Sequence, residues 1–236
     1  MRTHFGELIR PAKYGFKLTR DKYLNESRKN HKPLSKVLII SLRERDQKYC
    51  ELMDSIFEDE WWRTYRPEIA EEMRARALKS FDLNMAYFSQ LDAKEFEHHV
   101  AQTVKSFSRI RRVERLADWE ETGGVYVMVL GEHRQVYVGQ SNNIRKRIKS
   151  HWGGAISISK AVFGRVDQSI MSIASFRALD TTAIYATEVP DFKRDKVEED
   201  VESSFDQKYV LNRIDAGRPD DVRIRFMALE ARRREL

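Results

Sequence analysis

The sequence predicts an α+β protein in which an α-rich region precedes a small β-hairpin unit with its own helices. Two observations carry this prediction. Apolar residues recur at helical spacing over residues 45–116, and after a breaker at Gly123-Gly124 the apolar pattern switches to a period of two. A length of 236 residues allows one large domain or two small ones. The switch in period favours two, residues 1–118 and residues 119–236.

The composition indicates an intracellular, cytoplasmic protein that does not enter a membrane. The single cysteine, Cys50, excludes a disulfide-stapled fold and fits a reducing compartment. No apolar run approaches the roughly 18 residues of a membrane span, and the first residues lack the apolar core of a signal peptide. The net charge of +6 permits a polyanionic partner.

The positive charge is concentrated at the beginning of the chain. Residues 1–45 contain 12 Lys or Arg against 4 Asp or Glu, whereas residues 46–120 contain 12 against 16. In the first segment cations alternate with aromatic residues, and nucleic-acid binding uses cations on phosphates and rings stacked on bases. A solvated basic arm explains the same pattern equally well. The nucleic-acid-binding candidates are Lys17, Arg20, Lys22, Arg28 and Lys29.

The α-rich region contains several local signals. Residues 36–42 are apolar and β-branched, which is typical of either a strand or the start of a buried helix. Pro67 lies near the start of one predicted helix, and Asp92 is a predicted N-cap of another. We interpret the aromatic residues here as core, and no motif in this region indicates chemistry.

The next segment predicts a β-hairpin. Residues 125–130 alternate along a strand, residues 131–134 make a turn, and a second strand follows. If Leu130 pairs with Gln135, then Tyr126 lies opposite Gly139, and Tyr126 and Tyr137 become diagonal neighbours on one face. A slip of one residue would separate the two tyrosines.

A helix follows the hairpin. Arg147 and His151 flank its apolar stripe, whereas Arg145 and Lys149 are expected to point outward and join the nucleic-acid-binding candidates. Arg147 covering the core edge with its stem and His151 as a packing residue are the alternative interpretations. The stripe consists of Ile144, Ile148 and Trp152.

The last predicted elements are a strand over residues 181–189 and a helix from about Asp195 to Tyr209. Glu198 and Glu202 lie beside the apolar stripe of that helix, so a carboxylate can border the core there. Asn212 follows in the exit loop, where an asparagine usually forms a turn or a cap.

These residues resemble the GIY-YIG nuclease family over residues 121 to about 215. The resemblance rests on Gly124-Val125-Tyr126, Val136-Tyr137-Val138-Gly139, Arg147, His151 and the later helical Glu202. It implies a mainly antiparallel three-stranded sheet flanked by helices. It also implies hydrolysis of nucleic-acid phosphodiesters, DNA more than RNA, with Mg²⁺ or Mn²⁺. The predicted biological role is that of an endonuclease in restriction, phage defence or a mobile element.

The resemblance also implies roles at the reacting centre. Tyr126 is the expected base and Tyr137 positions the water or the phosphate; the reverse assignment of the two roles stays open. A phenol with a pKa near 10 is a poor base at neutral pH, so a cation such as Arg147 must favour the phenolate. Arg147 also clamps phosphoryl oxygens, and His151 binds the nucleophile or relays a proton.

Glu202 is the metal ligand that the resemblance implies, and Asn212 hydrogen-bonds near the site. The short interval between them leaves Glu198 or Glu199 as alternative ligands. The insertion over residues 153–180 either contacts substrate or packs against the sheet.

Two other functions remain open at this point. One is a nucleic-acid-binding module that keeps the scaffold without cleaving. The other is a structural α+β domain in which the tyrosines and Arg147 only pack.

Overall fold

The computed structural model describes residues 2–10, 15–25, 27–30, 32–153, 156–162 and 165–211. The helices are α1 (Lys36–Arg45), α2 (Gln47–Ile56), α3 (Pro67–Gln90), α4 (Ala93–Ser106), α5 (Ile144–Gly153), α6 (Ile158–Ala161) and α7 (Arg194–Ser203). The strands are β1 (Arg2–His4), β2 (Glu7–Ile9), β3 (Leu24–Asn25), β4 (Arg111–Arg112), β5 (Gly124–Leu130), β6 (Gln135–Ser141), β7 (Ile156–Ser157) and β8 (Ala183–Glu188). The predicted α+β class is confirmed.

The main sheet is antiparallel, with the strand order β4-β8-β5-β6. The hairpin register is as predicted: Leu130 pairs with Gln135, Met128 with Tyr137, and Tyr126 with Gly139. The sheet has four strands instead of the expected three, because the two-residue strand β4 pairs with the outer edge of β8. So short and so polar a strand carries no signal in the sequence.

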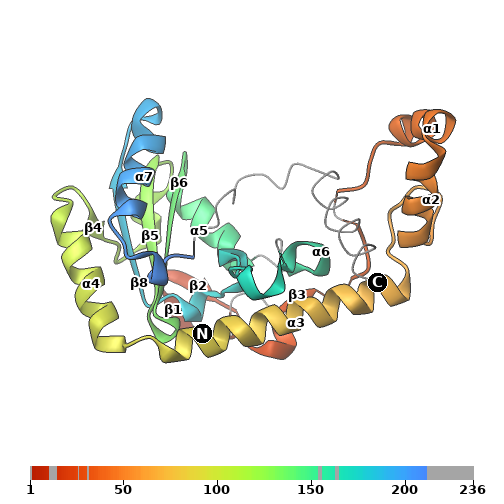
Figure 1. Cartoon of the computed structure of the whole chain (residues 1–236). Helices are drawn as coiled ribbons and strands as arrows, with labels where there is room; N and C mark the ends of the chain where they lie inside the picture. The colour runs from red at the N-terminus through yellow and green to blue at the C-terminus, as the bar shows by residue number, and fades with distance from the viewer. Residues whose placement is uncertain are drawn as a thin grey trace.

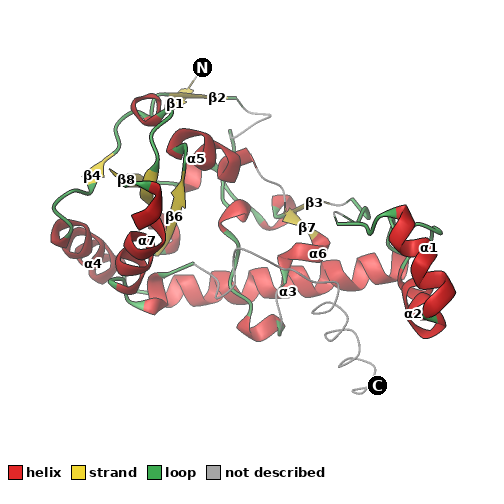
Figure 2. Cartoon of the chain, turned by 90° about the horizontal axis from the view of Figure 1, so that it is seen from above, coloured by secondary structure: helices red, strands yellow, loops and turns green. Residues whose placement is uncertain are grey.

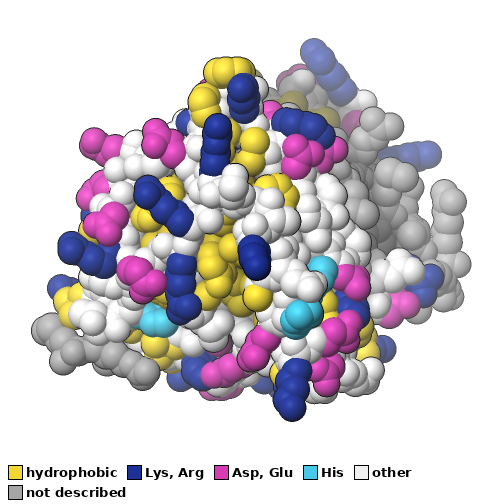
Figure 3. All heavy atoms as spheres, turned by 90° about the vertical axis from the view of Figure 1, so that its left-hand side faces the viewer, with side chains coloured by type: hydrophobic (Ala, Val, Ile, Leu, Met, Phe, Trp, Pro, Cys, Tyr) yellow, Lys and Arg dark blue, Asp and Glu magenta, His cyan; other side chains and the backbone are white. Residues whose placement is uncertain are grey.

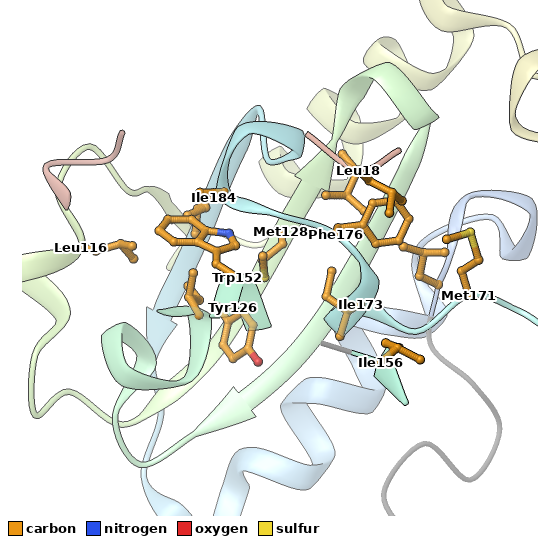
Figure 4. Packing of buried hydrophobic residues seen from close by; sticks show 14 of the residues in the cluster. Leu18, Leu116, Tyr126, Met128, Trp152, Ile156, Met171, Ile173, Phe176 and Ile184 are labelled. Carbon is orange, nitrogen blue, oxygen red and sulfur yellow. The ribbon is translucent and has the colours of Figure 1, made fainter. Parts of the chain in front are cut away.

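The two faces of the β5–β6 hairpin belong to different hydrophobic clusters. One face carries the valines of both strands and packs against Phe96 and Val100 of α4 and Val201 of α7. The other face carries Tyr126 and Met128, which pack with the apolar stripe of α5. Figure 4 shows Tyr126 beside Trp152 and Met128 in this second cluster. The sheet therefore separates α7 from α5.

The helices of the N-terminal half follow from local signals. Residues 36–42 form a helix and not a strand, since Ser35 caps α1 by accepting a hydrogen bond from the Leu38 amide at 3.3 Å. Pro67 is the first residue of α3, and Asp92 caps α4 through the Glu95 amide at 2.7 Å, as predicted.

The long helix α3 connects two ends of the molecule. The sheet with α4 and α7 lies at one end of α3, and α1 and α2 lie at the other (Figure 1). Tyr23 and Phe81 pack in the same cluster as Tyr126 and Trp152, so residues on both sides of position 118 build one core. The division into two domains at that position stays a prediction.

Two surface properties bear on function. Figure 3 shows the face at the left of Figure 1, where Lys and Arg side chains are interspersed with Asp and Glu. Among the helices of the described ranges, none has the length and apolar character needed to cross a membrane.

Candidate active site

The two tyrosines of the hairpin lie together over Gly139. Their ring centroids are 6.2 Å apart. A Cβ atom at Gly139 would lie 2.6 Å from the Tyr126 hydroxyl oxygen and 2.8 Å from the Tyr137 ring. Glycine at this position therefore allows both rings to lie against the strand.

Helix α5 brings a histidine and an arginine to the tyrosines. The Tyr126 hydroxyl and His151 Nε2 are hydrogen-bonded at 2.8 Å, and both residues are buried. The His151 and Tyr137 rings meet edge to face, with centroids 5.1 Å apart and an interplanar angle of 70°. The Arg147 guanidinium lies close enough to both tyrosine hydroxyls for its positive charge to lower the pKa of each. Four predicted site residues thus form one network.

Burial determines the protonation of this network in the free protein. It raises the pKa of Tyr126 well above its ordinary value, and Arg147 offsets this only in part. Burial likewise raises the pKa of Tyr137. Burial, with a smaller contribution from the Arg147 charge, lowers the pKa of His151 to about 3. Arg147 lowers the pKa of both tyrosines, as expected, but burial outweighs it, so both phenols are protonated and His151 is neutral at neutral pH in the free protein.

Glu198 on α7 is the carboxylate whose charge acts on this network. Burial raises the pKa of Glu198, and Gln140 Nε2 donates to Glu198 Oε2 at 2.7 Å. The negative charge of Glu198 contributes to the raised pKa of both tyrosines. Glu202 lies one turn further along α7, where its charge contributes to the raised pKa of Glu198. The choice of Glu202 as the metal ligand stays a prediction, and Glu198 is its better supported alternative.

The side chains around Glu198 suit a hard cation. A hollow of about 270 Å³ beside α7 is lined by Glu198, Glu199 and Glu202, together with Asp195, Ser203 and Gln207. In the described part of the chain, no group of three or more His, Cys, Asp or Glu side chains surrounds one point. Mg²⁺ accepts so few protein ligands because it keeps several waters and uses substrate phosphate. The residues therefore fit Mg²⁺ held by one or two carboxylates.

Three cations of the predicted basic arm are engaged within the protein. Lys17 pairs with Glu132, Arg20 with Asp82 at 2.8 Å, and Arg28 with Glu58 at 2.7 Å. The segment is also anchored, since the Leu18 amide donates to the Asp180 carboxylate and β3 pairs with β7. The segment therefore lies against the rest of the protein, but these three cation side chains are still 40–56% exposed, so the solvated and the nucleic-acid-binding interpretations both stay predictions.

The remaining nucleic-acid-binding candidates differ in their surroundings. The Lys22 ammonium lies 4.8 Å from the Phe16 ring centroid, and Lys29 is exposed. Arg145 and Lys149 were expected to point outward, but both reach the Glu7 carboxylate of β2. Asn212 lies outside the described residues.

Sequence reasoning missed Gln140 and Glu7. The alternation along the hairpin places Gln140 on the face covered by α7. A contact between Gln140 and a carboxylate of that helix could therefore have been predicted from the sequence. Glu7 carries no such signal, because its partners on α5 are 138 and 142 positions away.

Comparison with known proteins assigns one segment within the C-terminal half. Residues 122–190 match the family model of the GIY-YIG catalytic domain. This chain carries a GIY-YIG domain. The match includes Tyr126, Tyr137, Arg147 and His151 and ends before Glu198. No curated protein and no solved structure matches the chain. GIY-YIG domains are nuclease domains that act on nucleic acid, generally with divalent metal ions.

Proposed function

We propose that this GIY-YIG protein is a metal-dependent endonuclease that hydrolyses DNA phosphodiesters. The observation that carries the proposal is the network of two tyrosines, Arg147 and His151, with Glu198 acting on the same hydroxyls. A role in restriction, phage defence or a mobile element is the biological setting that the sequence resemblance implies.

Arg147 is the residue that receives the substrate. Its guanidinium is permanently charged and matches phosphoryl oxygens, so it holds the scissile phosphate beside the tyrosine hydroxyls. It also stabilises the additional negative charge of the pentacovalent transition state. Because the guanidinium lies near the two hydroxyls, a phosphate that it binds is brought beside them.

The Tyr126–His151 pair moves the proton of the attacking water. Tyr126 accepts that proton on its hydroxyl oxygen while its own phenolic proton passes to Nε2 of neutral His151. A phosphodiester at Arg147 offsets the guanidinium charge that lowers the pKa of His151, which makes the imidazole a better acceptor. No free phenolate is required, in agreement with the raised pKa of Tyr126.

Glu198, with Glu202 one turn away, would hold the metal ion. Bound Mg²⁺ would stabilise the charge that develops on the phosphate and on the departing 3′ oxygen. Gln140 keeps one oxygen of Glu198 engaged, and no described residue donates to the other, Oε1, which is free to be a ligand.

A nicking assay tests the proposal. Supercoiled plasmid, and in parallel a structured RNA, is incubated with Mg²⁺, Mn²⁺ or EDTA. We expect nicking of DNA that needs the metal and that Arg147→Ala abolishes. Arg45→Ala, an exposed cation on α1, is the matched control and keeps full activity. Activity surviving in Arg147→Ala refutes the mechanism. Salt-sensitive binding without nicking favours the non-cleaving module.

A further inference from the structure

The first strands of the chain form a hairpin that lies beside α5. β1 and β2 pair antiparallel around a turn at Phe5-Gly6, where both residues have positive φ. Both views of the ribbon place this hairpin next to α5 (Figures 1 and 2). Residues 2–9 lie more than a hundred positions before the segment that matches the GIY-YIG model.

A buried carboxylate connects the hairpin to α5. Glu7 is 8% exposed, and it accepts hydrogen bonds from Arg145 Nε at 2.6 Å and from Lys149 Nζ at 2.8 Å. Burial alone would raise the pKa of Glu7, but the hydrogen bonds and charges of Arg145 and Lys149 hold it below its ordinary value. Glu7 is therefore ionised and binds two successive turns of the helix.

Three neighbouring contacts fix the hairpin in place. The Phe5 ring stacks on Trp152 of α5, with centroids 6.3 Å apart and an interplanar angle of 25°. His4 Nε2 is hydrogen-bonded to the Thr181 carbonyl at 2.8 Å. The Leu116 amide donates to the Phe5 carbonyl at 2.9 Å. The β1–β2 hairpin is thus attached to α5, to the segment that precedes β5 and to the segment that precedes β8.

The two rows of polar residues on α5 lie on opposite sides of its buried stripe. Arg145 and Lys149, four positions apart, form the row that meets Glu7. Arg147 and His151, also four positions apart, form the row that meets the tyrosines. Positions two apart on a helix differ by roughly 200° in direction, so a rotation of α5 that frees one row displaces the other. The fully buried stripe and the hydrogen bond from Trp152 Nε1 to Thr181 Oγ1 at 3.0 Å hold one side of the helix, and the contacts of Glu7 add a polar restraint on a second side.

We infer that Glu7 is a positioning residue for the nuclease centre: by holding Arg145 and Lys149 it sets the rotation of α5, and with it the placement of Arg147 and His151. The inference rests on the proposed function. A catalytic group must be held within about 0.5 Å of its productive position, and a misplacement of about 1 Å costs roughly 100-fold in rate.

The test compares Glu7→Gln with Glu58→Gln, which removes the charge of an ion-paired glutamate remote from α5. Single-turnover nicking is measured at saturating and at limiting protein, well below the melting temperature of each variant. For Glu7→Gln we expect the single-turnover rate constant at saturation (kcat below) to be 10- to 100-fold lower, with the half-saturating protein concentration changed less than about threefold. Glu58→Gln is expected to match the wild type. A kcat of Glu7→Gln equal to that of the wild type overturns the inference.

The opposite outcome also overturns it. If Glu7→Gln binds DNA more tightly and cleaves it faster, then Glu7 withholds Arg145 and Lys149 from phosphate and does not position α5. Lys149→Gln is the second variant, because it removes one of the two contacts of Glu7 and keeps the Arg145–Glu7 pair. It therefore disturbs folding less than Glu7→Gln does. We expect an intermediate loss of kcat from it, and no loss contradicts the inference.

A measurement without nucleic acid separates this inference from the proposed function. The pKa of His151 is about 3 because of burial and the Arg147 charge. If α5 rotates in Glu7→Gln, the NMR titration of His151 moves toward 6.5, and in Glu58→Gln it does not. An unchanged His151 titration in Glu7→Gln overturns the inference. If the wild type does not nick DNA but Glu7→Gln still shows the shift of His151, only the proposed function is refuted.

Discussion

The substitution Gly139→Ala tests whether the close approach of the two tyrosines is what the activity needs. The new Cβ atom would lie 2.6 Å from the Tyr126 hydroxyl oxygen and 2.8 Å from the Tyr137 ring. Reaching an ordinary contact of 3.4 Å requires the Tyr126 hydroxyl to move by about 0.8 Å, the difference between 3.4 and 2.6 Å. Overpacking of this kind costs about 1–3 kcal/mol of folding free energy.

The effect on rate is expected to be larger than the effect on stability. A displacement of about 0.8 Å breaks the 2.8 Å hydrogen bond between Tyr126 and His151, so we expect roughly a 100-fold slower single-turnover nicking rate. Gly131→Ala is the control, because its Cβ meets Thr182 Oγ1 at 2.8 Å at the turn of the same hairpin, away from the tyrosines. Both variants are compared at equal fractions folded. A Gly139→Ala rate within about threefold of Gly131→Ala would refute the reasoning.

Three further predictions follow from the site. Glu198→Gln lowers the rate of Mg²⁺-dependent nicking by more than the roughly 10- to 100-fold typical of an outer-shell residue, and Glu202→Gln lowers it less than Glu198→Gln does. A Mg²⁺ titration in which Glu202→Gln is the more impaired variant contradicts this. Gln140→Leu raises the Mg²⁺ concentration for half-maximal rate about tenfold, whereas Gln47→Leu, which removes a 3.0 Å contact to Glu51 on α2, leaves it unchanged. Because the pKa of His151 is about 3 when folded and ordinarily 6.5, the unfolded state binds more protons between these values. The contribution of His151 to the free energy of unfolding is therefore constant above pH 6.5 and falls by up to about 1.4 kcal/mol per pH unit below it. Urea titrations at several pH values test this: if His151→Gln shows the same dependence of unfolding free energy on pH as the wild type, the prediction is contradicted.

The hairpin and its tyrosine pair could be predicted because they depend on local patterns. Alternation defines the faces of β5 and β6, and the length of the turn sets the register. Once Leu130 pairs with Gln135, the neighbours Tyr126, Tyr137 and Gly139 follow with no further information. Helical spacing likewise places Arg147 and His151 on one side of α5.

The role of the basic segment could not be read from the sequence, because charge along the sequence does not report charge in space. Lys17, Arg20 and Arg28 find acidic partners that are 115, 62 and 30 positions away. Arg145 and Lys149 likewise find Glu7 on a strand that no local signal predicts. The cations left for nucleic acid are those that tertiary contacts leave unpaired, and composition does not identify them.

The choice between Glu198 and Glu202 shows where helical spacing stops being informative. Both residues lie on the same side of α7, one turn apart, so periodicity cannot say which turn is level with the tyrosines. That depends on how α7 crosses β6. Gln140 Nε2 donates to Glu198 and to Asp195, residues three positions apart on α7, and so determines which turn of the helix lies against the strand. Tyr137 belongs to the same strand but points to the opposite face from Gln140, and the Glu198 charge still contributes to the raised pKa of both tyrosines. If this contact sets the height of α7, then Gln140→Leu weakens metal binding and Glu202 in part replaces Glu198. The double variant Gln140→Leu/Glu198→Gln is then less impaired than the product of the two single losses.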